Sequence, residues 1–156
     1  MHSKIIQISG NEIKKSDWIE EDMFYEGFVG EIADYVADMC DDDRLACLDY
    51  MKSELEGFVD VDLEQSTLQI ADRKAYFKRK YEEFENALSA LSKSSFDDFA
   101  SGNLGRYVYS LRASYDDDYS YYVYDSDYGS LYTFDSFMRD SEDIKYHIGA
   151  LIDYHF

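Results

Sequence analysis

The spacing of apolar residues changes along this chain, and that change limits its fold more than any other feature of the sequence. Through residues 24–55 and 71–92 large apolar residues recur every three or four positions, the spacing of one helix face. Residues 4–8 and the tyrosine-dense residues 106–134 instead favour strands, because they are rich in β-branched and aromatic side chains. A chain that contains both patterns is typical of the α+β class.

The first two thirds of the chain predict a short first strand, three helices and a second strand. A helix with an apolar face over residues 24–39 is expected to follow Ser16, whose side chain can cap it. A second helix is expected at residues 45–55 and a third at residues 71–92. Between them, residues 58–63 alternate in polarity and predict a strand.

The last third predicts an antiparallel three-strand meander that is rich in tyrosine, with aspartate-rich turns between its strands. The three expected strands are residues 106–112, 119–124 and 130–134. A closing C-terminal helix over residues 137–152, capped by Asp135 or Ser136, would complete the chain. We therefore expect one α+β domain over residues 1–156, with an N-terminal helical half, the meander and the terminal helix.

Charge is distributed unevenly, with 34 acidic and 15 basic residues and a formal net charge of -19. Residues 1–64 carry a net charge of -13 and residues 97–156 carry -8, whereas residues 65–96 carry +2. We expect no direct binding to nucleic acid or to an anionic membrane. No apolar run approaches the ~20 residues of a membrane-spanning helix, and the sequence starts without a signal-peptide pattern. Two cysteines make no disulfide framework, so a cytoplasmic protein is expected.

The first acidic flank lies on the predicted helix over residues 24–39 and just beyond it. Aspartates four residues apart on a helix would recur about every 6 Å, similar to the phosphate spacing along a DNA strand. No Lys or Arg lies between Asp17 and Asp43. A face that only increases solubility is the alternative interpretation. The candidate partner contacts of this flank are Asp34, Asp38, Asp41, Asp42 and Asp43.

The second acidic flank combines aspartates with tyrosines in the predicted meander. Nine tyrosines fall between Tyr107 and Tyr132, more than one buried sheet face needs. Tyrosine rings stack on Arg and Lys side chains, and carboxylates pair with them. A sheet packed on helices with tyrosines at its edges is the alternative. The candidate partner contacts of this flank are Asp116, Asp117, Asp118, Tyr121, Tyr124, Asp125 and Asp127.

A basic segment at residues 73–80 lies between the two acidic flanks and is followed by three glutamates. Ion pairs between residues one helical turn apart, and to neighbouring acids, explain such a segment. Self-association against an acidic flank is a second interpretation, so we expect a monomer or a homodimer.

The sequence contains no complete motif for catalysis or metal binding. Residues 60–64 resemble the start of a calcium loop but lack its glycine and its final glutamate. The histidines and cysteines do not have the spacing of a zinc site. The sequence contains neither a phosphate-binding loop nor a hydrolase nucleophile motif. We therefore expect no metal, no cofactor and no enzymatic activity.

The small size, the negative charge and the aromatic residues together resemble the acidic DNA-mimic proteins of phages and mobile elements, of the antirestriction and anti-CRISPR type. The resemblance covers the whole chain but includes no diagnostic motif, so it assigns no residue roles. It implies an inhibitor whose carboxylates occupy phosphate positions in the cationic DNA-binding groove of a host defence nuclease, in the cytoplasm of a bacterial cell.

The expected partner is thus a basic DNA- or RNA-binding protein such as a nuclease. Two other functions remain open at this point. The first is an immunity protein that neutralises a basic toxin. The second is a phage structural or assembly protein that uses the tyrosine sheet for contacts between subunits.

Overall fold

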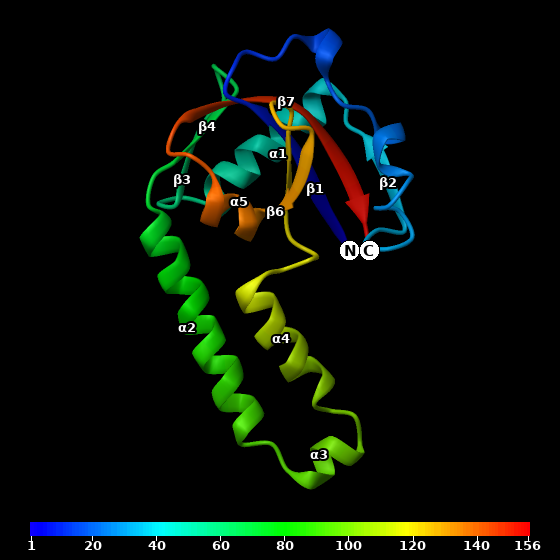
Figure 1. Ribbon diagram of the computed structural model, residues 1–156, viewed down its shortest axis with the longest axis vertical. Coiled ribbons are helices and arrows are strands. Elements are labelled where there is room, and N and C mark those ends of the chain that lie inside the picture. Colours follow the sequence, from blue (N-terminus) through cyan, green and yellow to red (C-terminus); the bar gives the residue numbers. More distant parts are fainter.

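A computed structural model describes residues 1–156 and confirms the α+β class, with a seven-stranded sheet and helices on the same chain (Figure 1). The strands are β1 (His2–Ser9), β2 (Tyr35–Asp38), β3 (Val59–Asp62), β4 (Thr67–Ile70), β5 (Tyr122–Asp125), β6 (Ser130–Thr133) and β7 (Lys145–His155). The helices are α1 (Asp41–Glu54), α2 (Arg73–Ser92), α3 (Phe96–Ala100), α4 (Gly105–Tyr115) and α5 (Phe134–Asp140), with 3₁₀ turns η1 (Lys15–Asp17) and η2 (Glu21–Phe24).

The sheet is organised around its last strand, β7. Its order is β3-β4-β7-β1-β5-β6, and only the β1–β5 pair is parallel. One edge of β7 pairs with β1, while the other edge pairs with β4 at residues 145–147 and with β2 at residues 152–155. Because β1 and β7 are antiparallel neighbours, the two ends of the chain lie side by side (Figure 1).

A hydrogen-bonded glutamine holds the centre of the sheet together. Buried Gln7 accepts hydrogen bonds at Oε1 from the backbone N–H groups of Ile19 and Ala150, and its Nε2 donates to Ser126 Oγ. Gly149 leaves room for this side chain, because a Cβ there would lie 2.3 Å from Gln7 Oε1. The glycine in a central strand therefore marks a close approach of a buried side chain.

The gap between β4 and β2 on the same edge of β7 is closed by an arginine from α1. Arg44 is buried and donates to the carbonyl oxygens of Ile148 and Gly149, at 2.9 and 2.7 Å. Its guanidinium also lies over the ring of Trp18, 5.0 Å from the centroid. The carbonyl groups that have no strand partner there are thus satisfied by a side chain.

Both faces of the sheet are covered. On one face, α1 and α5 pack against β1, β7 and β5 around Leu48, Met51 and Phe137. On the other face, the segment from Ile19 to Ala33 packs its aromatic residues against Tyr154 and its neighbours. As a result the central residues of β1 and β7 are buried on both sides of the sheet, and most of them are apolar.

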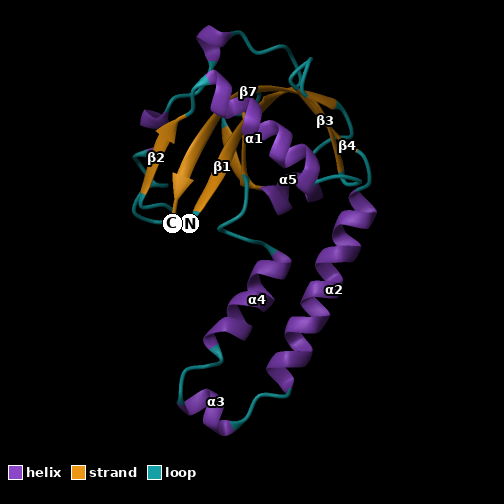
Figure 2. Ribbon diagram, turned by 180° about the vertical axis from the view of Figure 1, so that it is seen from behind, coloured by secondary structure: helices purple, strands orange, loops and turns teal.

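A helical arm projects away from the sheet (Figures 1 and 2). We call residues 73–115 the arm and the rest of the chain the body. Helices α2 and α4 run side by side as a hairpin with α3 at its far end, and only three of the arm's residues are buried, namely Tyr76, Ala87 and Ser114. None of the helices combines the length and the apolarity that crossing a membrane requires.

A buried aspartate of the body fixes the direction of the arm. Asp135 on α5 accepts hydrogen bonds from Tyr76 Oη at 2.6 Å and from Lys80 Nζ at 3.0 Å, both on α2. The backbone N–H of Asp117, just after α4, donates to the same carboxylate at 3.0 Å. One side chain therefore ties both helices of the arm to the body.

The prediction of a helix over residues 24–39 is wrong. This segment forms the end of η2, a series of turns and strand β2, and Ser16 caps no helix. Gly27 and Gly30 adopt positive φ angles of 86° and 90°, in the left-handed region that interrupts a helix. The apolar residues of this segment are buried in the core, but from turns and a strand.

Two predictions in the last third are also wrong. Residues 106–112 lie in α4, so the meander is reduced to the β5–β6 hairpin, and β5 pairs with β1. The closing helix is replaced by α5, capped by Thr133 rather than by Asp135 or Ser136, and by strand β7. The predicted first strand and the strand at 58–63 are confirmed, as are the helices at 45–55 and 71–92.

Candidate cation-binding pocket

The negative charge of the chain is concentrated in the body. The arm carries eight basic and five acidic residues, a net charge of +3. The rest of the chain carries seven basic and 29 acidic residues, a net charge of -22. The body is therefore the part of the molecule that attracts a cationic ligand.

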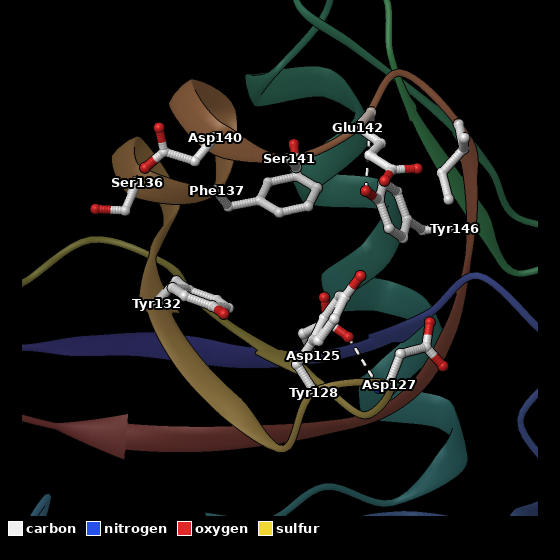
Figure 3. Close-up of a pocket in the computed structure, with 11 residues that line it drawn as sticks. Asp125, Asp127, Tyr128, Tyr132, Ser136, Phe137, Asp140, Ser141, Glu142 and Tyr146 are labelled. Atoms are coloured by element: carbon white, nitrogen blue, oxygen red, sulfur yellow. Dashed lines mark hydrogen bonds between the residues drawn. The ribbon is translucent and has the colours of Figure 1, made fainter.

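One pocket of the body has four carboxylates in its wall and no basic side chain (Figure 3). Its volume is about 410 Å³, and it lies between the β5–β6 hairpin, α5 and the start of β7. Three tyrosines and a phenylalanine complete most of the wall. The carboxylates are those of Asp125, Asp127, Asp140 and Glu142, and the aromatic residues are Tyr128, Tyr132, Phe137 and Tyr146.

Local hydrogen bonds of the β5–β6 turn position the first two carboxylates. Asp125 ends β5 and accepts a hydrogen bond from the backbone N–H of Asp127 at 2.9 Å. The Asp127 carboxylate accepts from Ser9 Oγ and from the backbone N–H of Gly10, both at 2.7 Å. Gly129, with a φ of 63°, completes the turn. This wall of the pocket is thus anchored to the end of β1.

The opposite wall comes from α5 and the loop after it. Asp140 and Glu142 are exposed, and in Figure 3 they lie across the pocket from Asp125. Buried Tyr146 donates its hydroxyl hydrogen to the Glu142 carbonyl oxygen at 3.2 Å. The hydroxyl of Ser141 is buried without a hydrogen-bond partner.

The charges of this pocket are not neutralised within the molecule. None of its four carboxylates forms an ion pair. Burial raises the pKa of Asp125, and the neighbouring charge of Asp127 adds to this effect. Burial likewise raises the pKa of Tyr146. A bound cation would favour the ionised form of Asp125 and relieve the repulsion between the carboxylates.

The arrangement suits an organic cation better than a metal ion. No group of three or more His, Cys, Asp or Glu side chains converges to hold a metal. Tyrosine rings and carboxylates around one cavity are the groups that bind a guanidinium or an ammonium, through cation–π contacts and charged hydrogen bonds. The pocket can therefore hold the end of an arginine or lysine side chain.

The structure separates the aspartates of the predicted first flank. Asp34 precedes β2 and Asp38 ends it, about 13 Å apart at the rise of a strand, so the 6 Å row of a helix is not formed. Asp34 lies 3.3 Å from the ring of His155, and Asp38 accepts a hydrogen bond from the backbone of Glu21.

The other three aspartates of that flank lie in the first turn of α1. Asp41, Asp42 and Asp43 are all exposed there, where negative charge stabilises a helix. Lys15 forms an ion pair with Asp41 at 2.7 Å, and this hydrogen-bonded contact lowers the pKa of the Asp41 carboxyl group. Part of this cluster is thus already neutralised by the chain itself.

The second flank is also divided. Asp116, Asp117 and Asp118 lie at the junction of arm and body, where Thr133 Oγ1 donates to Asp116 and Arg112 pairs with Asp118. These three residues are used to connect the arm. They do not line the pocket.

Neither of the two tyrosines of the second flank lines the pocket. Tyr121 donates its hydroxyl hydrogen to Glu54 on α1, and Tyr124 packs edge-on against Phe24. Only Asp125 and Asp127 of the twelve predicted contacts line it.

Asp140 and Glu142 were missed by the sequence analysis. They fall in the segment predicted as one closing helix, where they are two of three acidic residues and no spacing distinguishes them. Only the turn between α5 and β7 brings them opposite Asp125.

No protein-family model, curated protein or solved structure matches this chain. A proposal for its function therefore draws on the charge of the body and on the geometry of the pocket.

Proposed function

We propose that the protein is an inhibitor that binds the cationic DNA-binding surface of a host defence nuclease, in the manner of an anti-CRISPR or antirestriction protein. The observation that carries the proposal is the pocket with four unpaired carboxylates, three tyrosines and no basic side chain. Arginine fits this pocket better than lysine, because its planar guanidinium can stack on a tyrosine ring while it pairs with a carboxylate.

The body and the pocket have different tasks in this proposal. The net charge of -22 attracts a basic partner over a distance and speeds association. The pocket then holds one arginine that would otherwise contact a DNA phosphate. Because the same arginine cannot bind both, the inhibitor competes with DNA, in the bacterial cytoplasm where the nuclease works. The role is one of binding, and no catalytic step is assigned to this chain.

The row of aspartates on a helix does not support this proposal, because the structure does not form it. The likeness to DNA is instead one of net charge and of a single anchoring pocket. We therefore expect inhibition to depend on Asp140 and Glu142 more than on Asp34 or Asp38.

The test is a capture experiment from host lysate at low salt, with three forms of the protein as bait. The wild type is compared with Asp140→Lys/Glu142→Lys, which reverses two exposed charges of the pocket. The matched control is Asp60→Lys/Glu64→Lys, which makes the same change of charge at two exposed positions on and just after β3. The captured proteins are identified, and their DNA binding is measured with each bait.

We expect the wild type to capture a nuclease and to block its DNA binding, and the block to weaken as salt rises. The pocket variant should weaken inhibition by roughly tenfold or more, and the control by only about two- to threefold. Equal losses in both variants would contradict a role of the pocket. Capture of a basic toxin in place of a defence nuclease would identify an immunity protein, and capture of no basic protein would overturn the proposal.

A further inference from the structure

The arm exposes large apolar side chains along its whole length. Phe96 and Phe99 on α3 are 80% and 69% exposed, higher than most large apolar residues of the body. On α2, Tyr81 and Leu88 are also exposed, and they lie on the same helix face as half-buried Phe84. Monomeric proteins rarely leave an apolar surface of this kind uncovered.

A groove at the base of the arm is large enough to take an aromatic side chain. It has a volume of about 510 Å³ and lies where α2, α4 and α5 meet. Phe77, Tyr81, Phe84 and Tyr115 form its apolar wall. The guanidinium of Arg139 lies at its edge, 5.4 Å from the ring centroid of Phe77, and it forms no ion pair.

Charge changes sign along the arm. Residues 73–80, which we call the root, carry five basic residues and no acidic one. Residues 81–100, which we call the tip segment, carry five acidic residues and one basic residue. Within the root, Lys74 and Lys78 form no ion pair, and Asp97 at the far end forms none either.

We propose that two copies of this chain pair through their arms in antiparallel orientation. The Phe96 and Phe99 side chains of each copy enter the groove at the base of the other copy's arm, which makes the two contacts equivalent by a two-fold axis. This orientation places Asp97 of one copy near Lys78 and Arg139 of the other. The far end of one arm thus offers two phenylalanine rings and the Asp97 carboxylate, and the base of the other arm offers the groove with the cationic Lys78 and Arg139 beside it.

The alternative orientation of the same two arms is unfavourable. Parallel pairing would place root against root and tip against tip, so that like charges face each other. It would also bring together two bodies that each carry -22. Antiparallel pairing keeps the bodies at opposite ends of an arm about 30 Å long, well beyond the Debye length of about 8–10 Å.

The first test is sedimentation velocity of the full chain over a range of concentrations. We expect a monomer–dimer equilibrium in the wild type. The variant Phe96→Ser/Phe99→Ser, which removes only exposed rings, should raise the dimer dissociation constant by roughly tenfold or more. The matched control, Met23→Ser/Tyr50→Ser, removes two exposed apolar side chains of the body and should change it by less than about twofold.

The second test locates the contact. A zero-length carbodiimide cross-linker joins an amine and a carboxylate that touch. Lys78 and Asp97 of one copy are separated by about 20 Å of helix α2, so a cross-link between them can form only between copies. We expect this cross-link in the dimer and its loss in Lys78→Glu, with recovery when Lys78→Glu is mixed with Asp97→Lys.

Either of two results would overturn the inference. The first is a wild type that stays monomeric at every concentration tested. The second is a dimer that survives the loss of both phenylalanines and cross-links only through the body. The pocket assay described above uses different residues, so its outcome is independent of both tests.

Discussion

The body and the arm differ in where they place their apolar residues and in the sign of their net charge. The body places its apolar residues in two clusters on either side of a central sheet and covers its surface with acidic residues. The arm has three buried residues, a slight positive charge and several large apolar side chains in solvent, Phe96 and Phe99 above all. Apolar side chains exposed along a projecting arm favour contact with another protein surface, whereas the body buries most of its apolar residues in its own core.

The two regions also differ in how they are held. Buried polar side chains such as Gln7 and Arg44 hold strands of the body that are far apart in sequence. The arm depends on helix pairing and on polar contacts at its base, chiefly those of Asp135 in the body and of Arg73 at the start of α2. Substitutions in the body should therefore unfold the whole protein, while substitutions in the arm should act locally.

The largest effect is expected from adding one methyl group to the central strand. In Gly149→Ala the new Cβ would lie 2.3 Å from Gln7 Oε1, and Gln7 cannot move without losing its buried hydrogen bonds. We expect a loss of about 4 kcal/mol in the free energy of unfolding, measured by denaturant titration. The comparison is Gly105→Ala at the start of α4, where a Cβ meets nothing within 4 Å and stability should rise by about 0.5 kcal/mol.

An equal decrease in the free energy of unfolding of both alanine variants would contradict the contrast between body and arm. A small loss in Gly149→Ala would mean that Gln7 is not confined as its hydrogen bonds indicate.

The next largest effect concerns the anchor. Asp135→Asn leaves the ammonium of Lys80 buried without its charge partner, and such a loss costs about 3 kcal/mol. Hydrogen exchange should speed up in α2 and α4 while the amides of β1 and β7 stay protected. The double variant Lys80→Met/Asp135→Asn removes the unpaired charge and should recover much of the loss. Uniform acceleration through the sheet would show that arm and body unfold as one unit.

A smaller effect is expected at the far end of the arm. Ser95 caps α3, because its hydroxyl accepts a hydrogen bond from the backbone N–H of Asp98 while the Asp98 carboxylate accepts from the N–H of Ser95. Ser95→Ala should cost about 1 kcal/mol of local stability. Exchange rates of amides in α3 would report it, and those of the body serve as the control. A drop in the stability of the sheet would contradict a local role.

The smallest effect is that the pKa values of two carboxyl groups, those of Asp98 and Asp125, shift in opposite directions. Hydrogen bonds from the backbone and hydroxyl of Ser95 lower the pKa of Asp98, so its contribution to stability is present above pH 3.8 and is lost as pH falls through the lowered pKa. Burial raises the pKa of Asp125, so its ionisation costs stability as pH rises above 3.8, and acid removes that cost. NMR titration of the carboxyl carbons should give an Asp125 midpoint above 3.8 and an Asp98 midpoint below it. Coincident midpoints would remove the distinction.

Parts of the fold with one-sided patterns could be predicted from the sequence. Helices α1 and α2 repeat apolar residues every three or four positions, and β3 alternates in polarity. Strand β7 could not, because a strand buried on both faces has a continuous apolar run, and Ile144, Ile148, Leu151 and Ile152 also fit a helix. The sequence of helix α4 predicts a strand because its tyrosines and valine favour strands, while pairing with α2 favours a helix.

The candidate site shows the same limit. Asp125 and Asp127 were predicted because they stand in a turn of a tyrosine-rich segment. Asp140 and Glu142 needed the true course of residues 134–155, since only the turn between α5 and β7 brings them opposite the hairpin. An error in one element therefore removed half of the carboxylates from the predicted site.

The position of β7 at the centre of the sheet has a consequence for synthesis. At roughly 5–20 residues per second, a ribosome needs on the order of ten seconds to reach Lys145. Through that interval β1 has no antiparallel neighbour, whereas α2 and α4 can already pair because their contacts are local. The arm can thus form while the chain is still growing, but the sheet must wait for its final strand, and chaperones that bind extended apolar segments have their opportunity during that wait.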